Sequence, residues 1–179
     1  MTSPDEKEIV IRFEHVSLSF DDKRVLDDVS FALERGWMTI ITGDSGSGKT
    51  VLLRLAIGLL QPDSGKILIE GREVEKMTET ALLHLRSLTM GLVFQEDALF
   101  TGLSVYDNTA YRLVEHEWAE ADIEKAVTEI LRFVGLEQDM EKLPEELSIG
   151  MRKRLELARA LVGWPPIMLF DEPTSGLDP

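Results

Sequence analysis

The alternation of apolar and polar side chains predicts two strands near the start of the chain. Residues 9–20 alternate for much of their length, and residues 25–33 form a second β-rich run after a charged turn. Together they predict an antiparallel edge layer. The run WMTIIT over residues 37–42 is short, apolar and β-branched, which predicts a further strand. It leads through a glycine-rich turn into a predicted helix over residues 50–60.

Strand and helix patterns continue to alternate in the middle of the chain. After the breaker QPDSG, residues 66–74 predict a strand with a turn at Gly71 that rejoins the edge layer. Residues 79–88 predict a helix, and the run MGLVFQ predicts a buried strand. Residues 97–147 lose strand signals and show helical spacing, which predicts a helical insertion. One face of this insertion carries Ile123, Val127, Ile130 and Val134, with Gly135 at the stop.

The last part of the pattern decides the fold class. A helix over residues 151–161 precedes the apolar strand IMLF, which leads into Asp171. Because helices separate the strands in this order, the sequence predicts an α/β fold with a mostly parallel sheet and ligands at the carboxyl ends of its strands. We expect residues 1–179 to form a single domain, with a helical subdomain at about 97–147 inserted in the α/β core.

Composition and charge exclude several classes of function. The 19 lysines and arginines against 33 aspartates and glutamates give a net charge of -14, which repels nucleic acid phosphates. The chain has no cysteine, so disulfides and thiolate metal sites are absent. Its most apolar segment is shorter than the roughly 20 residues that cross a bilayer, and its start lacks a secretory signal. We therefore expect a cytoplasmic protein with no direct membrane insertion, whose membrane role acts through a partner.

The glycine-rich turn matches the phosphate-loop pattern GxxxxGK[ST] between a predicted strand and a predicted helix. Its glycines let the backbone curl so that N–H groups point inward, and the helix N-terminus adds its positive end. We expect Lys49 to reach the β- and γ-phosphates of ATP, and the Thr50 hydroxyl to ligate the Mg²⁺ that bridges them. The alternative is a flexible turn that binds nothing. The predicted phosphate-binding residues are Gly43, Asp44, Ser45, Gly46, Ser47, Gly48, Lys49 and Thr50.

Two adjacent carboxylates follow the strand IMLF. In a parallel sheet, the carboxyl end of this strand lies beside the phosphate loop. Asp171 then suits Mg²⁺, held directly or through water, and Glu172 suits orientation and polarisation of the water that attacks the γ-phosphate. The alternative is that both acids are simply solvated at the end of a strand.

Three further stretches narrow the class of nucleotide hydrolase. Gln95 follows the MGLVF strand, ELSIGMRKRLELARAL precedes the IMLFDE strand, and SGLD follows DEPT. In this order the motifs resemble those of the ATP-binding cassette (ABC) family: phosphate loop, Q-loop, signature segment, Walker B strand and D-loop. The resemblance runs from about Ile9 to Pro179. It implies a P-loop NTPase core of the RecA-like type and an ATPase subunit that drives a membrane permease.

The resemblance also assigns residues that the pattern alone does not. It implies that Phe20 stacks on adenine, and that Gln95 binds Mg²⁺ and senses the γ-phosphate. Family domains pair head to tail, so it implies a homodimer in which Ser148 and Gly150 contact the nucleotide held by the opposite subunit. Two alternatives remain open: Phe20 is a strand residue packed in the edge layer, and Ser148 only caps the start of a helix. The expected catalytic residues are Lys49, Gln95 and Glu172.

A nearer resemblance lies in FQEDALFTGLSVYDNTAYRLVEH and in Met151, which stands where the family signature usually has glutamine. These stretches are similar to the ATPase subunit of the Mla-type lipid transport systems. The similarity implies phospholipid as the transported substrate and a location on the inner face of the cell membrane, through the permease. The alternative is a generic cassette in which these residues are only core and cap residues.

Two departures from the family pattern keep a non-catalytic alternative open. Position 149 is Ile where the family generally has the first signature glycine, and we expect its β-branched side chain to weaken contacts with the opposite nucleotide. The family places a γ-phosphate-sensing histidine on a later strand, whereas all three histidines of this sequence lie upstream of Glu172. The resemblance therefore implies a cassette that is incomplete at its C-terminus, and we expect the 179-residue chain to bind Mg·ATP weakly and to turn it over poorly. The alternative function is a nucleotide-binding or permease-interaction module that hydrolyses nothing.

Overall fold

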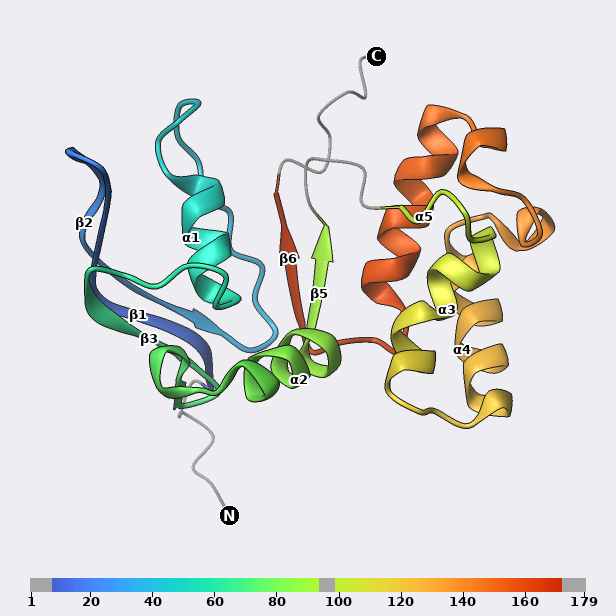
Figure 1. The fold of residues 1–179 in the computed structure, drawn as a ribbon, viewed down its shortest axis with the longest axis horizontal. Helices are drawn as coiled ribbons and strands as arrows, with labels where there is room; N and C mark the ends of the chain where they lie inside the picture. Colours follow the sequence, from blue (N-terminus) through green and yellow to red (C-terminus); the bar gives the residue numbers. More distant parts are fainter. Residues whose placement is uncertain (1–7, 94–98, 172–179) are drawn as a thin grey trace. The chain divides into compact units, whose positions relative to one another are not determined.

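A computed structural model describes residues 8–93 and 99–171 of the chain. The chain divides into two compact units, residues 1–84 and residues 85–179, and the division falls within one helix. Figure 1 shows the elements coloured in chain order. The single domain with an inserted helical subdomain stays a prediction.

The first unit is built on a four-stranded antiparallel sheet with the order β2-β1-β3-β4 (Figure 1). This sheet confirms the predicted antiparallel layer, including the turn at Gly71 that returns the chain to it. Two helices and a 3-10 turn complete the unit, and the second helix continues across the division. The strands are β1 (Ile9–Phe20), β2 (Lys23–Glu34), β3 (Ser64–Ile69) and β4 (Arg72–Glu73), and the other elements are α1 (Lys49–Ala56), η1 (Val74–Lys76) and α2 (Glu79–Thr89).

A β-bulge explains why the apolar residues of β1 depart from strict alternation. Ile11 and Phe13 are buried before the bulge, and Val16 and Leu18 are buried after it. The pairing register with β2 shifts between Phe13 and Val16, where His15 has φ 53°. Because side chains alternate across a regular strand, only the inserted residue keeps both apolar pairs buried.

The helix α1 ends earlier than the sequence predicts, because Gly58 forms a C-terminal cap. Gly58 has φ 69°, and its N–H donates to the Leu55 carbonyl at 3.0 Å. The Leu59 N–H donates to the Arg54 carbonyl at 2.9 Å. These two bonds form a Schellman motif, which favours glycine just after the helix. The apolar spacing continues to Leu60, so it overestimates the length of the helix.

The predicted strand over residues 37–42 is not formed, and that prediction is wrong. The segment lies outside both described sheets, and Trp37, Met38 and Ile40 are 76%, 86% and 75% exposed. A strand is stable only when its backbone groups bond to a neighbour and one of its faces is packed. The run WMTIIT has the composition of a buried strand, but no described strand pairs with it.

The second unit combines a parallel strand pair with three packed helices. The strands β5 (Met90–Val93) and β6 (Ile167–Phe170) pair in parallel, which confirms both predicted strands. The helical spacing within residues 97–147 is confirmed, because helices form there and pack on one another (Figure 1). A mostly parallel sheet beyond this pair stays a prediction. The helices are α3 (Val105–Glu115), α4 (Glu120–Phe133) and α5 (Ile149–Leu161), with the 3-10 turns η2 (Glu137–Asp139) and η3 (Pro144–Glu146) between the last two.

The predicted apolar face of the helical insertion lies in the core of the second unit. Its members Ile123, Val127, Ile130 and Val134 are all buried, and they pack with buried residues of α3 and α5. The chain leaves α4 through a Schellman motif at Gly135, whose φ is 71°. Both the face and the stop that the sequence predicts are therefore confirmed.

Candidate nucleotide-binding site

Two glycines in left-handed conformations curl the loop over residues 43–50. Gly46 has φ 78° and Gly48 has φ 96°, values that residues with a side chain rarely adopt. The Ser47 N–H donates to the Asp44 carbonyl at 3.2 Å, which closes the turn. The loop geometry therefore accounts for these two glycines of the phosphate-loop segment.

Gly48 also lets the loop approach the hairpin of the first unit closely. A Cβ atom on Gly48 would lie 3.1 Å from Leu26 Cδ2 and 3.2 Å from Val25 Cγ1. Gly48 is the N-cap of α1, and the first turn of this helix contains no acidic residue. The loop thus leads into the N-terminus of a helix, which carries a partial positive charge. Because the first turn contains no acidic residue, that charge is not offset there. Sequence analysis missed Val25 and Leu26 as neighbours of the loop, and the glycine at position 48 is the one sequence signal that points to such a contact.

Main-chain oxygens of the loop hold the Lys49 side chain. The Lys49 Nζ donates to the Gly43 carbonyl at 2.8 Å and to the Asp44 carbonyl at 2.9 Å. Both of these acceptors are neutral, so the ammonium charge is not cancelled by them. The loop residues from Gly43 to Ser47 are exposed, and Gly48 is buried. The loop therefore offers a positive charge, curled main chain and a helix N-terminus to an anion.

The donors of the first unit suit a divalent cation that arrives with a nucleotide. Thr50, in the first turn of α1, carries a hydroxyl oxygen, a hard ligand that Mg²⁺ takes together with phosphate oxygens. Within residues 8–93 and 99–171, no group of three or more His, Asp or Glu residues is placed to hold a metal ion. The Thr50 hydroxyl at the start of α1 fits a Mg²⁺ ion that is bound together with nucleotide phosphates.

Phe20 lies at the end of β1, in the hairpin that borders the loop. It pairs with Lys23, and Val25 of the same hairpin contacts the Gly48 position. The Phe20 side chain is 44% exposed, so the alternative of a packed core aromatic does not describe it. An exposed ring at this place is available for stacking. Its role with adenine stays a prediction.

Asp171 is buried just beyond the carboxyl end of β6. Its side chain is 5% exposed, and its N–H donates to the Val93 carbonyl at 2.9 Å, which extends the pairing with β5. The alternative of a solvated carboxylate is therefore wrong for Asp171. The predicted catalytic residues Glu172 and Gln95 lie outside the described residues.

The signature segment begins α5. The Ser148 hydroxyl accepts a hydrogen bond from the Met151 N–H at 3.3 Å and so caps the helix. Ile149 is 59% exposed in the first turn, and a Cβ on Gly150 would meet nothing within 4 Å. Ile149 therefore leaves the start of the helix intact, and its expected effect on the opposite nucleotide stays a prediction. The same holds for the contacts of Ser148 and Gly150 with that nucleotide.

The predicted site residues divide between the two units. The phosphate loop and Phe20 belong to the first unit, whereas Asp171, Ser148 and Gly150 belong to the second. The convergence of Lys49 and Asp171 on one nucleotide accordingly stays a prediction.

Comparison with known families decides the class of protein. The family model described as ABC transporter matches residues 26–175. The chain belongs to the ABC transporter family. This match spans the phosphate loop, the helical insertion and Asp171, and it confirms the resemblance drawn from the motifs. ABC ATPases bind and hydrolyse ATP, which agrees with the loop geometry of the first unit.

Relatives of this ABC cassette carry several transport names. It is 44% identical over 172 residues to the probable ribonucleotide transport ATP-binding protein mkl of Mycobacterium leprae, covering 96% of this chain and 49% of mkl. It is 41% identical over 165 residues to the intermembrane phospholipid transport system ATP-binding protein MlaF of Escherichia coli, covering 92% of this chain and 61% of MlaF. Among solved structures, the dimeric cassette MJ0796 in a post-hydrolysis state with ADP and Pi is similar with a TM-score of 0.84 and 28% identity, covering 94% of this chain and 76% of that one.

These relatives limit what the family membership establishes. The names of mkl and MlaF state different transported substrates at similar identities, so the Mla-type subgroup is not established. The cassette spans about half the length of mkl. None of the helices in the described ranges is both long and apolar enough to cross a bilayer.

Proposed function

We propose that this cassette is the ATP-hydrolysing subunit of an ABC transporter, and that it couples ATP-driven closure of a cassette dimer to transport by a membrane permease. The observation that carries the proposal is the loop at the N-terminus of α1. There Gly46 and Gly48 curl the main chain, and Lys49 is held by two neutral carbonyls. Such a loop suits the phosphates of a nucleotide.

In this proposal, different residues bind the phosphates, hold Mg²⁺ and activate the attacking water. Main-chain N–H groups of the loop and Lys49 bind the phosphates and withdraw charge from the γ-phosphate. Thr50, Gln95 and Asp171 hold Mg²⁺, which when bound neutralises charge on the phosphate oxygens. Glu172 orients and polarises the water that attacks the γ-phosphate. The position of Asp171, just beyond the carboxyl end of β6 in a parallel strand pair, supports its role in holding Mg²⁺, because ligands bind at the carboxyl ends of parallel strands.

A dimer completes the proposed site. Residues 148–150 are all exposed at the start of α5, which leaves Ser148 and Gly150 accessible to a nucleotide on the partner subunit. The dimeric state of MJ0796 with ADP and Pi, a structural relative, supports this arrangement. Binding of ATP then favours the closed dimer, and hydrolysis removes the bridging γ-phosphate and reopens it.

The finer proposal concerns the substrate. We propose phospholipid, moved by a permease that holds the cassette at the inner face of the cell membrane. The similarity to MlaF supports it, together with the residues from Phe94 to His116 and Met151 that first indicated the Mla-type systems. The test is reconstitution with the membrane protein that copurifies with the chain. ATP-dependent movement of labelled phospholipid supports the proposal, and movement of a ribonucleotide instead contradicts it.

Hydrolysis itself is tested with purified protein and two variants. Glu172→Gln is expected to lower the rate of phosphate release by roughly 100-fold or more, because it removes the group that activates water. Lys49→Ala is expected to weaken ATP binding as well, since it removes the charge held in the loop. The matched control is Lys125→Ala, which removes an exposed lysine of α4.

The dimer provides a second measurement of the same site. With ATP, Glu172→Gln is expected to accumulate as a particle of twice the monomer mass in light scattering, whereas Lys49→Ala stays monomeric. ATP binding with no hydrolysis in the wild type would favour the non-catalytic module that Ile149 in the signature keeps open. Hydrolysis that is the same in all four proteins would overturn the proposed active site.

A further inference from the structure

Three exposed aromatic residues lie together on the second unit, near the ends of its three packed helices. Trp118 follows α3, Phe133 is the last residue of α4, and Trp164 follows α5. These residues are 39%, 65% and 55% exposed. The ring centres of Phe133 and Trp164 lie 5.9 Å apart, edge to face, and a Cβ on Gly163 would lie 3.7 Å from Trp118 Cη2. Because Gly163 precedes Trp164 directly, these contacts join the three rings into one patch, which we call the aromatic surface.

The aromatic surface is large enough to bind another molecule. An aromatic side chain buries about 150–250 Å² when it is fully covered, so the exposed fractions of the three rings leave roughly 300 Å² uncovered. Single exposed apolar residues are ordinary, whereas a connected patch of this size is typical of an interaction site. A standard protein interface buries about 800 Å² on each partner. The aromatic surface therefore suits one helix of a partner better than a whole domain.

The backbone that carries Trp164 is strained. Gly163 has φ 78° and Trp164 has φ 50°, so both residues are in the left-handed region. This region is rare for a bulky side chain and costs about 1–2 kcal/mol. Trp164 is more than half exposed, so its packing within the described chain offsets only part of that cost. Strain of this kind is typical of segments that bind a ligand or a partner.

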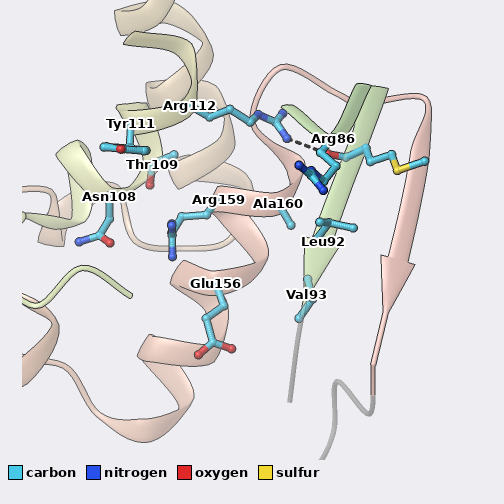
Figure 2. Close-up of a pocket in the computed structure, with 11 residues that line it drawn as sticks. Arg86, Leu92, Val93, Asn108, Thr109, Tyr111, Arg112, Glu156, Arg159 and Ala160 are labelled. Atoms are coloured by element: carbon cyan, nitrogen blue, oxygen red, sulfur yellow. Dashed lines mark hydrogen bonds between the residues drawn. The ribbon is translucent and has the colours of Figure 1, made fainter. Parts of the chain in front are cut away.

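Arg112 fixes the strained loop to the rest of the second unit. Its Nη2 donates to the Val162 carbonyl, and its Nη1 donates to the Met90 carbonyl at 3.1 Å. Figure 2 shows the Arg112 side chain with the second of these bonds dashed, at the cavity that it lines together with Arg86 and Arg159. The loop after α5 is thereby tied to α3. The Trp164 ring is positioned before a partner arrives, which lowers the entropy cost of binding.

Carboxylates flank the aromatic surface at Trp118. Residues 115–124 contain five carboxylates and no lysine or arginine. Outside the described ranges the sequence has a single lysine, Lys7, and no arginine, which cannot offset five carboxylates. Beside Phe133, the Arg132 guanidinium lies 2.7 Å from the Glu137 carboxylate, so that pair carries no net charge. The border of the aromatic surface is therefore acidic.

Two of these carboxylates have no role in stabilising a helix. Glu115 is the last residue of α3, and Glu117 lies two residues beyond it. Both are exposed. A negative charge near the C-terminus of a helix is unfavourable, because that end carries a partial negative charge. The helix therefore does not explain these acids, and an interaction with a cationic partner does.

We propose that the aromatic surface binds a basic amphipathic helix of a partner protein. Apolar side chains on one face of that helix cover Trp118, Phe133 and Trp164, and lysines or arginines beside them pair with Glu115 and Glu117. Charge selects this occupant over two others. A second copy of this chain would bring the same carboxylates to the contact and also has a net charge of -14, and an anionic membrane would likewise be repelled.

The test is a titration of the full chain with a labelled synthetic peptide, followed by fluorescence anisotropy without ATP. The peptide has about 18 residues, with leucine on one helical face and lysine on the other, and a matched peptide has glutamate in place of every lysine. We expect saturable binding of the lysine peptide and none of the glutamate peptide. Trp164→Ala is expected to raise the Kd by about tenfold or more, because it removes a large aromatic anchor. The matched control is Trp37→Ala, at a 76% exposed tryptophan of the first unit, which should keep the Kd.

The acidic border is tested separately. Glu115→Gln combined with Glu117→Gln is expected to raise the Kd by about threefold or more and to reduce its dependence on salt. The thermal midpoint should not fall, because both carboxylates lie at the C-terminal end of α3. The control combines Glu141→Gln with Glu145→Gln, which removes two exposed carboxylates near η3 and should leave the Kd unchanged.

The proposal is overturned if the lysine peptide shows no saturable binding, or if Trp164→Ala and Trp37→Ala have the same Kd. Binding to phosphatidylglycerol vesicles that Trp164→Ala abolishes would assign the surface to a membrane instead. Dimerisation without ATP that the same variant abolishes would assign it to a second copy, and either result contradicts the proposal. Should Trp164→Ala fail to fold, Phe133→Ser replaces it with the same expected loss. None of these measurements involves ATP, so their failure would leave the proposed function untouched.

Discussion

Gly48→Ala tests whether the loop is built around close contact with the hairpin of the first unit. The perturbation adds one methyl group at φ 96°, where a Cβ would lie 3.1 Å from Leu26 Cδ2 and 3.2 Å from Val25 Cγ1. The matched control is Gly46→Ala, at φ 78°, where a Cβ meets nothing within 4 Å. Both variants lower the entropy of the unfolded chain equally, so that contribution cancels in the comparison.

The expected magnitudes follow from backbone strain and contact. Gly46→Ala places alanine in the left-handed region, which costs about 1–2 kcal/mol. Gly48→Ala lies further from the allowed left-handed region, and strain of this kind costs roughly 1–3 kcal/mol. Its contacts also force Leu26 and Val25 to move by a few tenths of an ångström. We therefore expect Gly48→Ala to destabilise the protein by about 1–2 kcal/mol more than Gly46→Ala does.

The assay is urea unfolding followed by far-ultraviolet circular dichroism, with ATP affinity measured in parallel by calorimetry. The midpoint should fall further for Gly48→Ala than for Gly46→Ala, and ATP binding should weaken in the same order. Equal midpoints, or a milder effect at position 48, would show that the loop does not pack on Val25 and Leu26 as described.

Three further changes have expected outcomes. Asn108→Ala removes a 1% exposed amide that bonds to Phe100, Leu103 and Ser104, so urea unfolding should show a loss of about 2–4 kcal/mol, and a loss below 1 kcal/mol would contradict the network. Ser148→Ala should cost about 1 kcal/mol in the same assay while Ser148→Asp costs little, because aspartate also caps helices. The hydrogen bond from Lys66 holds the pKa of Glu14 below its ordinary value, so this carboxylate stabilises the fold above the unfolded pKa and loses that effect as pH falls through the folded pKa. Glu14→Gln should therefore flatten the fall in thermal midpoint between about pH 5 and pH 3, by a small amount that salt reduces further, and an unchanged pH profile would rule the pair out.

Local sequence patterns predicted most of the helices and strands, because the spacing of apolar residues and the glycine caps that determine them lie within a few residues of one another. Ile123, Val127 and Ile130 recur at helical spacing and are buried together, and Gly135 ends their helix as a left-handed cap. The phosphate loop was predictable for the same reason, since its glycines and Lys49 are consecutive. Asp171 was placed at a strand end by the apolar run before it, although its burial was not evident from sequence.

Features that depend on distant residues were not predictable. Residues 37–42 have strand composition, but a strand also requires a partner, and no described strand pairs with this run. The contact of Gly48 with Val25 and Leu26 joins segments more than 20 residues apart. The grouping of Arg86, Arg112 and Arg159 around one cavity was not predictable either, because these residues form no motif in sequence and come together only through packing of the second unit.

The central claim is that the phosphate loop and the carboxylates at 171 and 172 act on one nucleotide. Paramagnetic broadening by Mn²⁺, added with ATP to the Glu172→Gln variant, tests it most directly in a spectrum that resolves backbone amides. The account expects a single bound ion to broaden the Thr50 and Asp171 amide signals at the same Mn·ATP concentration, with no broadening by Mn²⁺ alone. Broadening at Thr50 while the Asp171 signal stays sharp would contradict it.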